Sequence, residues 1–317
     1  MGYNQEKEQI TITFPQEIPA SSKVVLSIEF TGEINDKLVG FYRSSFEDPT
    51  RNNEKRHLAV THFEPTDARR AFPCWDEPNV KATFDITLEV QPEFVALSNM
   101  HVVEERTVNG KKRVKFATTP IMSTYLVAFA VGPLEFTEQT NKCGTLVRVY
   151  TTPGIVHQGE FALNCACRIL EFFSDYFGIP YPMKKMDMIG IPDFSMGAME
   201  NWGLVTYRTT ALLFDPKDST TQAKQRVTSV VAHELAHQWF GNLVTMDWWT
   251  DLWLNEGFAT WAGTLATDFL FPDWQVWTEF IVEDVNNGLQ LDSLRSSHPI
   301  EVDVKNPSEI GQIFDAI

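Results

Sequence analysis

Alternating apolar and polar side chains dominate the first ~130 residues, a pattern that predicts β-strands with one buried face. A strong hairpin-turn signal, Asn109-Gly110, lies between two of the predicted strands. This part of the chain is therefore predicted to be an antiparallel β-domain. The apolar residues that recur at every second position are Leu26, Ile28 and Phe30; Ala82, Phe84, Ile86, Leu88 and Val90; and Tyr125, Val127 and Phe129.

Helical periodicity replaces this alternation in the rest of the chain. Apolar residues three or four apart predict a helix from Phe161 to Phe177, which Gly178 ends. Strand-like sequence follows over 186–207. Further helices are predicted over 221–240 and 254–271, and a third with Asp273 as its N-cap. The pattern predicts a β-domain over residues 1–133 and an α+β domain over residues 134–317, with the boundary near Gly132-Pro133.

The composition indicates a globular protein with an acidic surface. The 317 residues are 43% apolar and 12% aromatic, enough for two domains and a substantial core. A formal net charge of −16 disfavours nucleic acid as a partner, because phosphate contacts need basic patches. An acidic surface either attracts cationic substrates such as peptide N-termini or only aids solubility.

Features that indicate the compartment point to the cytoplasm. No stretch approaches the roughly 18 apolar residues of a transmembrane helix, and the polar start of the chain does not resemble a signal peptide. The four cysteines are interpreted as free thiols, since Cys165 and Cys167 would face different directions on a helix. The alternative is a part of a longer secreted or membrane protein. The other two cysteines are Cys74 and Cys143.

The strongest chemical signal is the pentapeptide HELAH at residues 233–237, followed by Glu256. Two imidazoles four residues apart on a helix, His233 and His237, share one face and can bind one metal ion. A third ligand, Glu256, leaves one coordination position open, as in catalytic zinc sites. HExxH alone also matches buried amphipathic helices by chance, and Glu256 weakens that alternative.

Glu234 lies beside the first histidine, where it can act as general base toward a water that zinc activates and then pass the proton to the leaving amine. Three polar residues, Asp247, Asp251 and Asn255, lie close in sequence. They either orient the histidines or serve as solvated and capping residues. The sequence does not choose among the three residues, and for each it favours the solvated or capping role.

A second constellation, Gly197-Ala198-Met199-Glu200-Asn201, precedes the HELAH helix in strand-like sequence. Small residues allow a substrate backbone to approach an exposed strand edge. Glu200 could then hold the α-ammonium group of a substrate as an ion pair. Taken alone, the segment is better interpreted as a glycine-containing strand with one exposed carboxylate.

GAMEN followed by HExxH, eighteen residues and glutamate resembles the joint signature of the aminopeptidase N-like zinc aminopeptidases of the gluzincin clan. The segments 63–78, from Phe63 to Pro78, and 237–245, from His237 to Thr245, also resemble that family. The resemblance covers essentially the whole chain. It implies a saddle-like antiparallel β-domain, followed by a thermolysin-like zinc metallopeptidase domain.

The resemblance implies that the protein hydrolyses the N-terminal residue from peptides with a free N-terminus. One zinc ion per chain would be held by His233, His237 and Glu256, with Glu234 as the catalytic base. Glu64 and Glu200 would grip the ammonium group of the substrate, which disfavours the alternative of a zinc endopeptidase of the same clan. The substrate-binding residues implied in this way are Glu64, Gly197, Ala198, Met199, Glu200 and Asn201.

The sequence departs from this family at three places. A tyrosine that donates to the oxyanion in the family would lie beyond Ile317, so we expect the second domain to be incomplete at its end. The resemblance also implies that the first domain is incomplete at its start. Losing one oxyanion donor lowers the rate by about 10²–10³, so the alternative function is a catalytically impaired, zinc-loaded peptide-binding or regulatory fragment. His62 replaces a frequent glutamine and is either a substrate contact or a strand-surface histidine. Thr209 replaces a usual glutamate.

Overall fold

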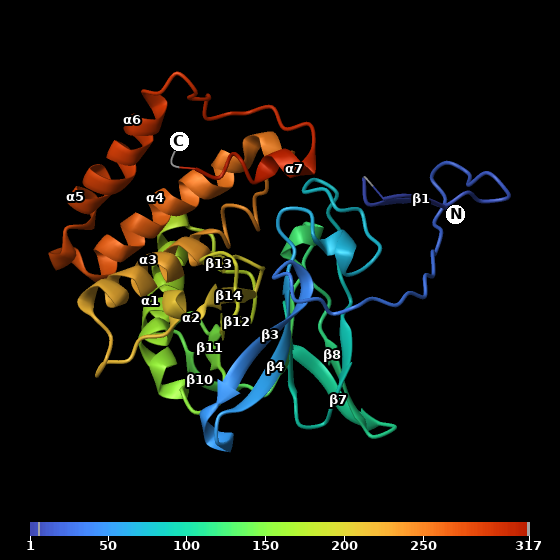
Figure 1. Ribbon diagram of the computed structural model, residues 1–317, viewed down its shortest axis with the longest axis horizontal. Coiled ribbons are helices and arrows are strands. Elements are labelled where there is room, and N and C mark those ends of the chain that lie inside the picture. The colour runs from blue at the N-terminus through green and yellow to red at the C-terminus, as the bar shows by residue number, and fades with distance from the viewer. Residues whose placement is uncertain (6, 316–317) are drawn as a thin grey trace.

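Two antiparallel sheets form the N-terminal part of the protein in the computed structural model, which describes residues 1–5 and 7–315 (Figure 1). The larger sheet has the strand order β3-β4-β9-β6, and the smaller has the order β5-β8-β7. The predicted antiparallel β-domain is confirmed. Its strands are β3 (Gly40–Asp48), β4 (Glu54–His62), β5 (Thr87–Val90), β6 (Val95–Ser98), β7 (Val102–Val108), β8 (Lys111–Phe116) and β9 (Phe129–Gly132).

The hairpin between β7 and β8 forms at the predicted turn. Asn109 and Gly110 both have positive φ, 51° and 75°, which is the backbone that a two-residue hairpin of this twist requires. The alternation before this hairpin is also observed, because Phe84, Ile86 and Leu88 are partly buried while the residues between them are exposed. Local pattern and turn chemistry therefore agree in this region.

Three local predictions are wrong. No strand forms around Ile28, and the neighbouring Leu26 and Phe30 are 47% and 56% exposed. Alternation produces a strand only where a neighbouring strand supplies hydrogen bonds and cover, and the segment 22–34 has no such neighbour. Tyr125 lies in a 3-10 turn, Thr124–Leu126, rather than in a strand. Asp273 belongs to a separate 3-10 turn, so the next helix begins only at Val276.

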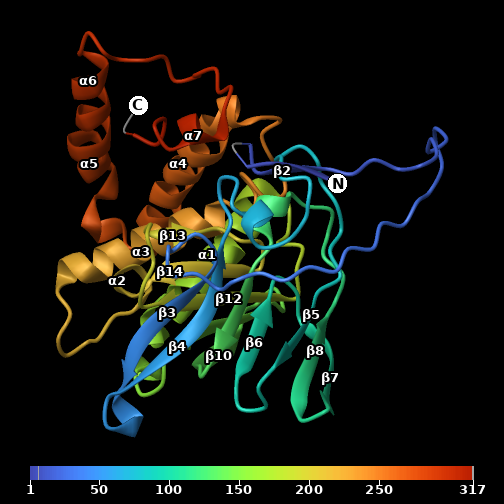
Figure 2. The ribbon, with the colours of Figure 1, turned by 45° about the vertical axis from the view of Figure 1, so that its right-hand side comes forward.

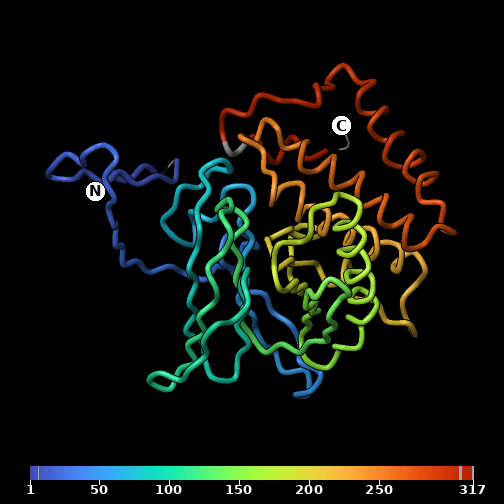
Figure 3. The backbone as a smooth tube through the Cα atoms, turned by 180° about the vertical axis from the view of Figure 1, so that it is seen from behind, coloured from blue at the N-terminus to red at the C-terminus, as the bar shows by residue number. Residues whose placement is uncertain are grey.

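The N-terminal hairpin stands away from the body of the molecule. Strands β1 (Gly2–Asn4) and β2 (Gln9–Thr11) pair antiparallel with each other. All views show the hairpin and the extended segment after it projecting beside the β-domain (Figures 1, 2 and 3). One ion pair, between Arg70 Nε and Glu8 Oε1 at 3.2 Å, links the hairpin to the body.

A five-stranded mixed sheet organises the second part of the chain, with the order β10-β11-β12-β14-β13. The central pairs β11–β12 and β12–β14 are parallel, and the outer pairs are antiparallel. Every residue of β12 is buried, as expected for a central strand with both faces covered. The strands are β10 (Glu135–Thr140), β11 (Leu146–Thr151), β12 (Lys185–Ile191), β13 (Ala198–Met199) and β14 (Leu204–Arg208).

Helices pack on this sheet and on one another (Figure 2). The first helix packs against β10 and β11 and ends at Gly178, whose φ of 65° is the left-handed cap that glycine favours. The HELAH helix ends at Ala236, four residues before the predicted end, because the chain turns sharply at Gly241 with a φ of 119°. The helices are α1 (Glu160–Phe177), α2 (Thr209–Leu212), α3 (Thr221–Ala236), α4 (Leu252–Leu270), α5 (Val276–Phe280), α6 (Asn286–Asp292) and α7 (Pro307–Ile310), with a π-type turn, Ile281–Val285, between α5 and α6.

The two parts share one apolar core. Buried residues of the β-domain, such as Tyr42 and Val60, belong to the same cluster as Val231 and Ala259 of α3 and α4. Strand β9 ends the β-domain sheet at Gly132 and β10 begins the mixed sheet at Glu135, and the domain boundary between them remains a prediction. None of the helices within the described residues is long and apolar enough to cross a membrane.

Candidate active site

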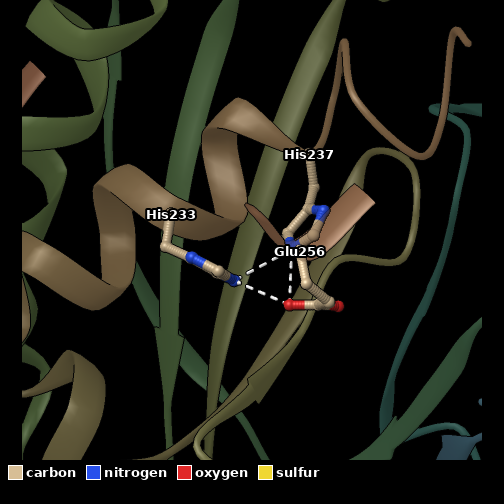
Figure 4. Close-up of side chains that lie close together, drawn as sticks. All are labelled: His233, His237 and Glu256. Atoms are coloured by element: carbon tan, nitrogen blue, oxygen red, sulfur yellow. Dashed lines mark hydrogen bonds and ion pairs between the residues drawn. The ribbon is translucent and has the colours of Figure 1, made fainter. Parts of the chain in front are cut away.

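Close packing of α3 against α4 brings together the three side chains predicted as metal ligands. His233 and His237 lie on one face at the end of α3, and Glu256 lies on the first turns of α4 (Figure 4). The helices approach closely at Gly263, where an added Cβ would lie 3.0 Å from the backbone nitrogen of His233. A side chain at this position would push α4 away from the histidines.

The three side chains converge on one point. The Nε2 atoms of His233 and His237 are 2.9 Å apart, and they lie 3.3 and 3.6 Å from Oε2 of Glu256. Tetrahedral coordination with bonds of about 2.0–2.1 Å separates ligand atoms by about 3.3 Å, so the triad fits one zinc ion. Two imidazoles and one carboxylate also match zinc in donor type.

Hydrogen bonds from the far side of each imidazole favour this interpretation. Nδ1 of His237 lies 2.9 Å from the carbonyl oxygen of Phe240, which only accepts, so the ring proton resides on Nδ1 and the Nε2 lone pair is free. Nδ1 of His233 lies 3.4 Å from Oγ1 of Thr260. Both partners were missed at the sequence level, although Thr260 follows Glu256 by four residues and so shares its face of α4.

Asp247, Asp251 and Asn255, the three residues considered for orienting the histidines, form other contacts. Oδ1 of Asp247 accepts a hydrogen bond from Asn79 at 3.3 Å, and Asp251 occupies the N-cap position of α4. Asn255 is buried and donates from Nδ2 to the Tyr125 hydroxyl at 3.4 Å. It therefore contacts the β-domain beneath the triad rather than either imidazole directly.

Glu234 is buried at 5% exposure and lines the same cavity as the metal triad. Its Oε2 atom has no hydrogen-bond partner among the described residues. Burial, with the charges of Glu200 and Glu256, raises the pKa of Glu234 well above its usual value despite the opposing effect of His237. An unpaired carboxylate beside the triad can accept a proton from a water in the cavity.

The sheet edge beside the cavity carries the second constellation. Strand β13 pairs only with β14 and is the last strand of the sheet, as the sequence predicted for an exposed edge. Glu200 follows it directly, is 3% exposed, and its Oε1 atom has no hydrogen-bond partner among the described residues. Its backbone carbonyl accepts from Asn242 Nδ2 at 2.9 Å and from Gln238 Nε2 at 3.4 Å. Neither amide was predicted from the sequence.

Glu64 reaches the same point from the β-domain. One oxygen from each of Glu64, Glu200 and Glu256 lies within 4.8 Å of the others. Burial and the negative charges of the other carboxylates raise the pKa of Glu64 well above its usual value, and burial raises the pKa of Glu200. Carboxylates crowded in this way are stabilised by cations, so the cavity suits a metal ion and an ammonium group together.

The cavity has a volume of about 560 Å³ and contains every charged residue predicted for the site. His62 is 5% exposed and stacks on Phe194 at 5.1 Å, so the prediction of a strand-surface histidine is wrong. It ends β4, lines the cavity and lies against Phe194 and Ser195 of the segment that follows β12. Lining residues that the sequence did not indicate are Val39, Pro65, Asp67, Ser195, Met196, Ser229, Val230, Thr260, Gly311 and Phe314, whereas Met199 and Asn201 are buried behind the lining.

A helix with HExxH, a second helix with a glutamate, and an open strand edge above them are typical of metallopeptidases. Comparison with known families agrees with this class. The Peptidase M1 N-terminal domain matches residues 1–126, and the Peptidase family M1 domain matches residues 161–317. The chain belongs to the peptidase M1 family.

Curated relatives of this chain are named as aminopeptidases. Aminopeptidase M1-A of Oryza sativa subsp. japonica is 60% identical over 313 residues, and Aminopeptidase M1 of Arabidopsis thaliana is 56% identical over 313 residues. Puromycin-sensitive aminopeptidase of Caenorhabditis elegans is 51% identical over 318 residues. These alignments cover 98–100% of this chain but only 33–35% of the relatives, so the chain spans about a third of their length.

Proposed function

We propose that this protein is a zinc aminopeptidase that removes single residues from the N-termini of peptides. The observation that carries the proposal is the position of Glu64 and Glu200 beside the triad of His233, His237 and Glu256 in one cavity. The triad supplies the electrophilic centre, and the two extra carboxylates supply a binding site for a cation. A free peptide N-terminus is the cation that a peptidase would meet there.

The metal triad and Glu234 would carry the chemistry. Zinc, when bound, polarises the scissile carbonyl and lowers the pKa of water toward ~7. Glu234 accepts a proton from the attacking water and delivers it to the leaving amine, which its unpaired Oε2 atom leaves it free to do. His237 is held in orientation by the Phe240 carbonyl and His233 by Thr260.

The two remaining carboxylates would give the exopeptidase specificity. Glu64 and Glu200 bind the α-ammonium group of the first residue, and the open edge of β13 accepts the substrate backbone. A substrate with extra residues or a blocking group at its N-terminus would collide with Glu64 and Glu200. Ala198, Met199 and Asn201 shape the edge strand and its end, and Gly197 leaves space beside it, since an added Cβ would meet nothing within 4 Å.

The proposal is tested by release of a fluorophore from an unblocked leucyl-amide substrate, with an N-acetylated version as control. We expect turnover of the unblocked substrate that a chelator abolishes and one equivalent of zinc restores. Equal cleavage of both substrates would instead indicate an endopeptidase. A folded, zinc-loaded chain without turnover would leave peptide binding as its function.

A cytoplasmic location is part of the proposal. All four cysteines are free thiols, as in proteins of reducing compartments, and Cys165 and Cys167 are buried. Peptides with free N-termini are the partners that the cavity would take. Microscopy of the tagged protein would test the location, and a secretory or organellar signal would contradict it.

A further inference from the structure

Every backbone carbonyl in the turn that follows the edge strand accepts a hydrogen bond, three of the four from buried side chains. This turn comprises residues 200–203 and is called the 200–203 turn below. Its first carbonyl accepts from Gln238 and Asn242, and the second accepts from the Leu204 amide at 3.0 Å. The last two are held from other elements, by Asn99 and Lys185. Asn99 and Lys185 are therefore partners that tie the turn to other elements.

Asn99 connects the β-domain to the turn. It follows β6 and is fully buried. Its Nδ2 atom donates to the carbonyl of Leu126 at 2.7 Å and to the carbonyl of Trp202 at 2.9 Å, while its Oδ1 atom accepts from the Ala128 amide at 3.0 Å. One side chain therefore binds the β-domain twice and the 200–203 turn once. Each of these groups would be left unsatisfied by a smaller apolar side chain.

Lys185 makes the second connection. Lys185 is 2% exposed, and its ammonium group donates to the carbonyls of Ser98 at 2.7 Å and Gly203 at 2.8 Å. Its third partner is Asp187 at 2.7 Å, which also receives two hydrogen bonds from Arg148. The three ammonium protons thus all have acceptors, as a buried charge requires.

The 200–203 turn and the β-domain are tightly packed where they meet. Gly203 has a φ of 80°, and an added Cβ would lie 2.4 Å from the carbonyl oxygen of Asn99 and 2.7 Å from the sulfur of Met183. The two backbones touch at this point. A shift of the β-domain at Asn99 would therefore move the turn that carries Glu200.

We propose that Asn99 and Lys185 form an interdomain clasp that sets the position of Glu200 relative to Glu64. The inference rests on the proposed function, in which both carboxylates bind one ammonium group. Glu64 belongs to the β-domain and Glu200 to the mixed sheet, so their separation depends on how the two parts meet. The carbonyls that the clasp holds, those of Trp202 and Gly203, lie two and three residues from Glu200 in sequence, and direct hydrogen bonds fix them to Asn99 and Lys185. Asn99 and Lys185 are therefore positioning residues for amine recognition.

The first test compares Asn99→Ala with Ser98→Ala. Ser98 is equally buried and its Oγ atom donates to the Ala128 carbonyl at 2.9 Å, so its loss removes a β-domain hydrogen bond without touching the turn. We expect Asn99→Ala to raise KM for the unblocked leucyl amide by roughly 10–100-fold with kcat changed by less than about threefold, and Ser98→Ala to change KM by less than about twofold. Equal effects of both variants would overturn the clasp.

A double-mutant cycle with Glu200→Ala separates positioning from general damage. If Asn99 acts through Glu200, adding Asn99→Ala to Glu200→Ala produces no further rise in KM. Additive effects of the two substitutions would mean that Asn99 acts by another route, and the inference would fail. Lys185→Met serves as the second variant if Asn99→Ala does not fold, because Asp187 keeps its two hydrogen bonds from Arg148.

Amide hydrogen exchange tests the clasp without any turnover. The Leu204 amide donates to the Asn201 carbonyl across the turn, so its exchange reports whether the turn stays closed. We expect faster exchange at residues 200–206 in Asn99→Ala and Lys185→Met, and unchanged exchange there in Ser98→Ala. Unchanged exchange in the clasp variants overturns the inference. A wild-type chain that cleaves no unblocked peptide overturns the proposed function instead, and the exchange data distinguish the two failures.

Discussion

The cavity has two halves that are assembled in different ways: the half that we propose binds zinc, called the metal half, and the half that we propose binds the substrate ammonium group, called the amine half. His233, His237 and Glu256 come from two neighbouring helices of one part of the chain, within 24 residues of one another (233–256). Glu64 follows β4 of the β-domain and Glu200 follows β13 of the mixed sheet, and more than a hundred residues separate the two. Zinc binding should therefore depend on one local helix contact, whereas amine recognition should depend on how the two parts of the molecule meet.

The largest effect should follow from removing the proton acceptor of the metal half. In Glu234→Gln we expect kcat to fall by about 10²–10⁴, because the attacking water loses its general base. Zinc content, measured by atomic absorption, should stay near one per chain, since Glu234 is not a member of the triad. Loss of zinc in this variant would show that the two roles are not separate.

Substitution in the amine half should change binding rather than chemistry. For Glu200→Ala we expect KM for an unblocked substrate to rise by about 10–100-fold, as the loss of a charge-assisted contact of about 1.5–3 kcal/mol implies. The preference for unblocked over N-acetylated substrate should fall by the same factor. A lowered kcat with unchanged KM would place Glu200 in the chemistry instead and would break the comparison.

The helix contact beneath the triad is tested by Gly263→Ala. We expect a loss of about 1–3 kcal/mol in the free energy of unfolding and weaker zinc binding, because the new Cβ meets the backbone of His233 at 3.0 Å. Denaturant unfolding and chelator competition measure the two effects. Gly257→Ala is the matched control on the same helix: its Cβ would meet nothing within 4 Å, so stability should rise by about 0.5–1 kcal/mol. Destabilisation by both variants would indicate a general intolerance of α4.

The smallest effect concerns pH and the β-domain side of the cavity. Burial lowers the pKa of His62 to about 4, so between about pH 6.5 and pH 4 the unfolded chain binds a proton that the folded chain does not. The free energy of unfolding should therefore fall with decreasing pH in this window, by at most about 1.4 kcal/mol per pH unit from this residue. His62→Asn should flatten that slope in urea titrations at several pH values.

Asp67, which also lines the cavity, changes the free energy of unfolding with pH in the opposite direction. Burial raises the pKa of Asp67 to about 6, so its protonation stabilises the folded chain as the pH falls. Asp67 is present in both the wild type and His62→Asn, so its contribution cancels in the difference between them. An identical pH dependence of the two proteins would show that the pKa of His62 is the same in the folded and unfolded chains.

Short-range features were predicted well because their determinants lie within a few residues. The Asn109-Gly110 turn needs only two residues with positive φ, and Gly178 needs only the helix before it. His233 and His237 share a helix face by spacing alone. The strand around Ile28 failed because a strand also needs a partner, and alternation says nothing about whether one is present.

The sequence by itself determined the two-part β then α+β architecture, and it indicated the candidate metal ligands and the carboxylates that we propose for amine binding. Periodicity and spacing predict structure over one turn or one strand. A specific motif also indicates the chemistry that its residues can perform. Only the tertiary structure decided that Glu64 meets Glu200, that the Phe240 carbonyl and Thr260 hold the histidines, and that Asn99 reaches the 200–203 turn. These contacts join residues whose separation along the chain carries no periodic signal, so packing alone brings them together.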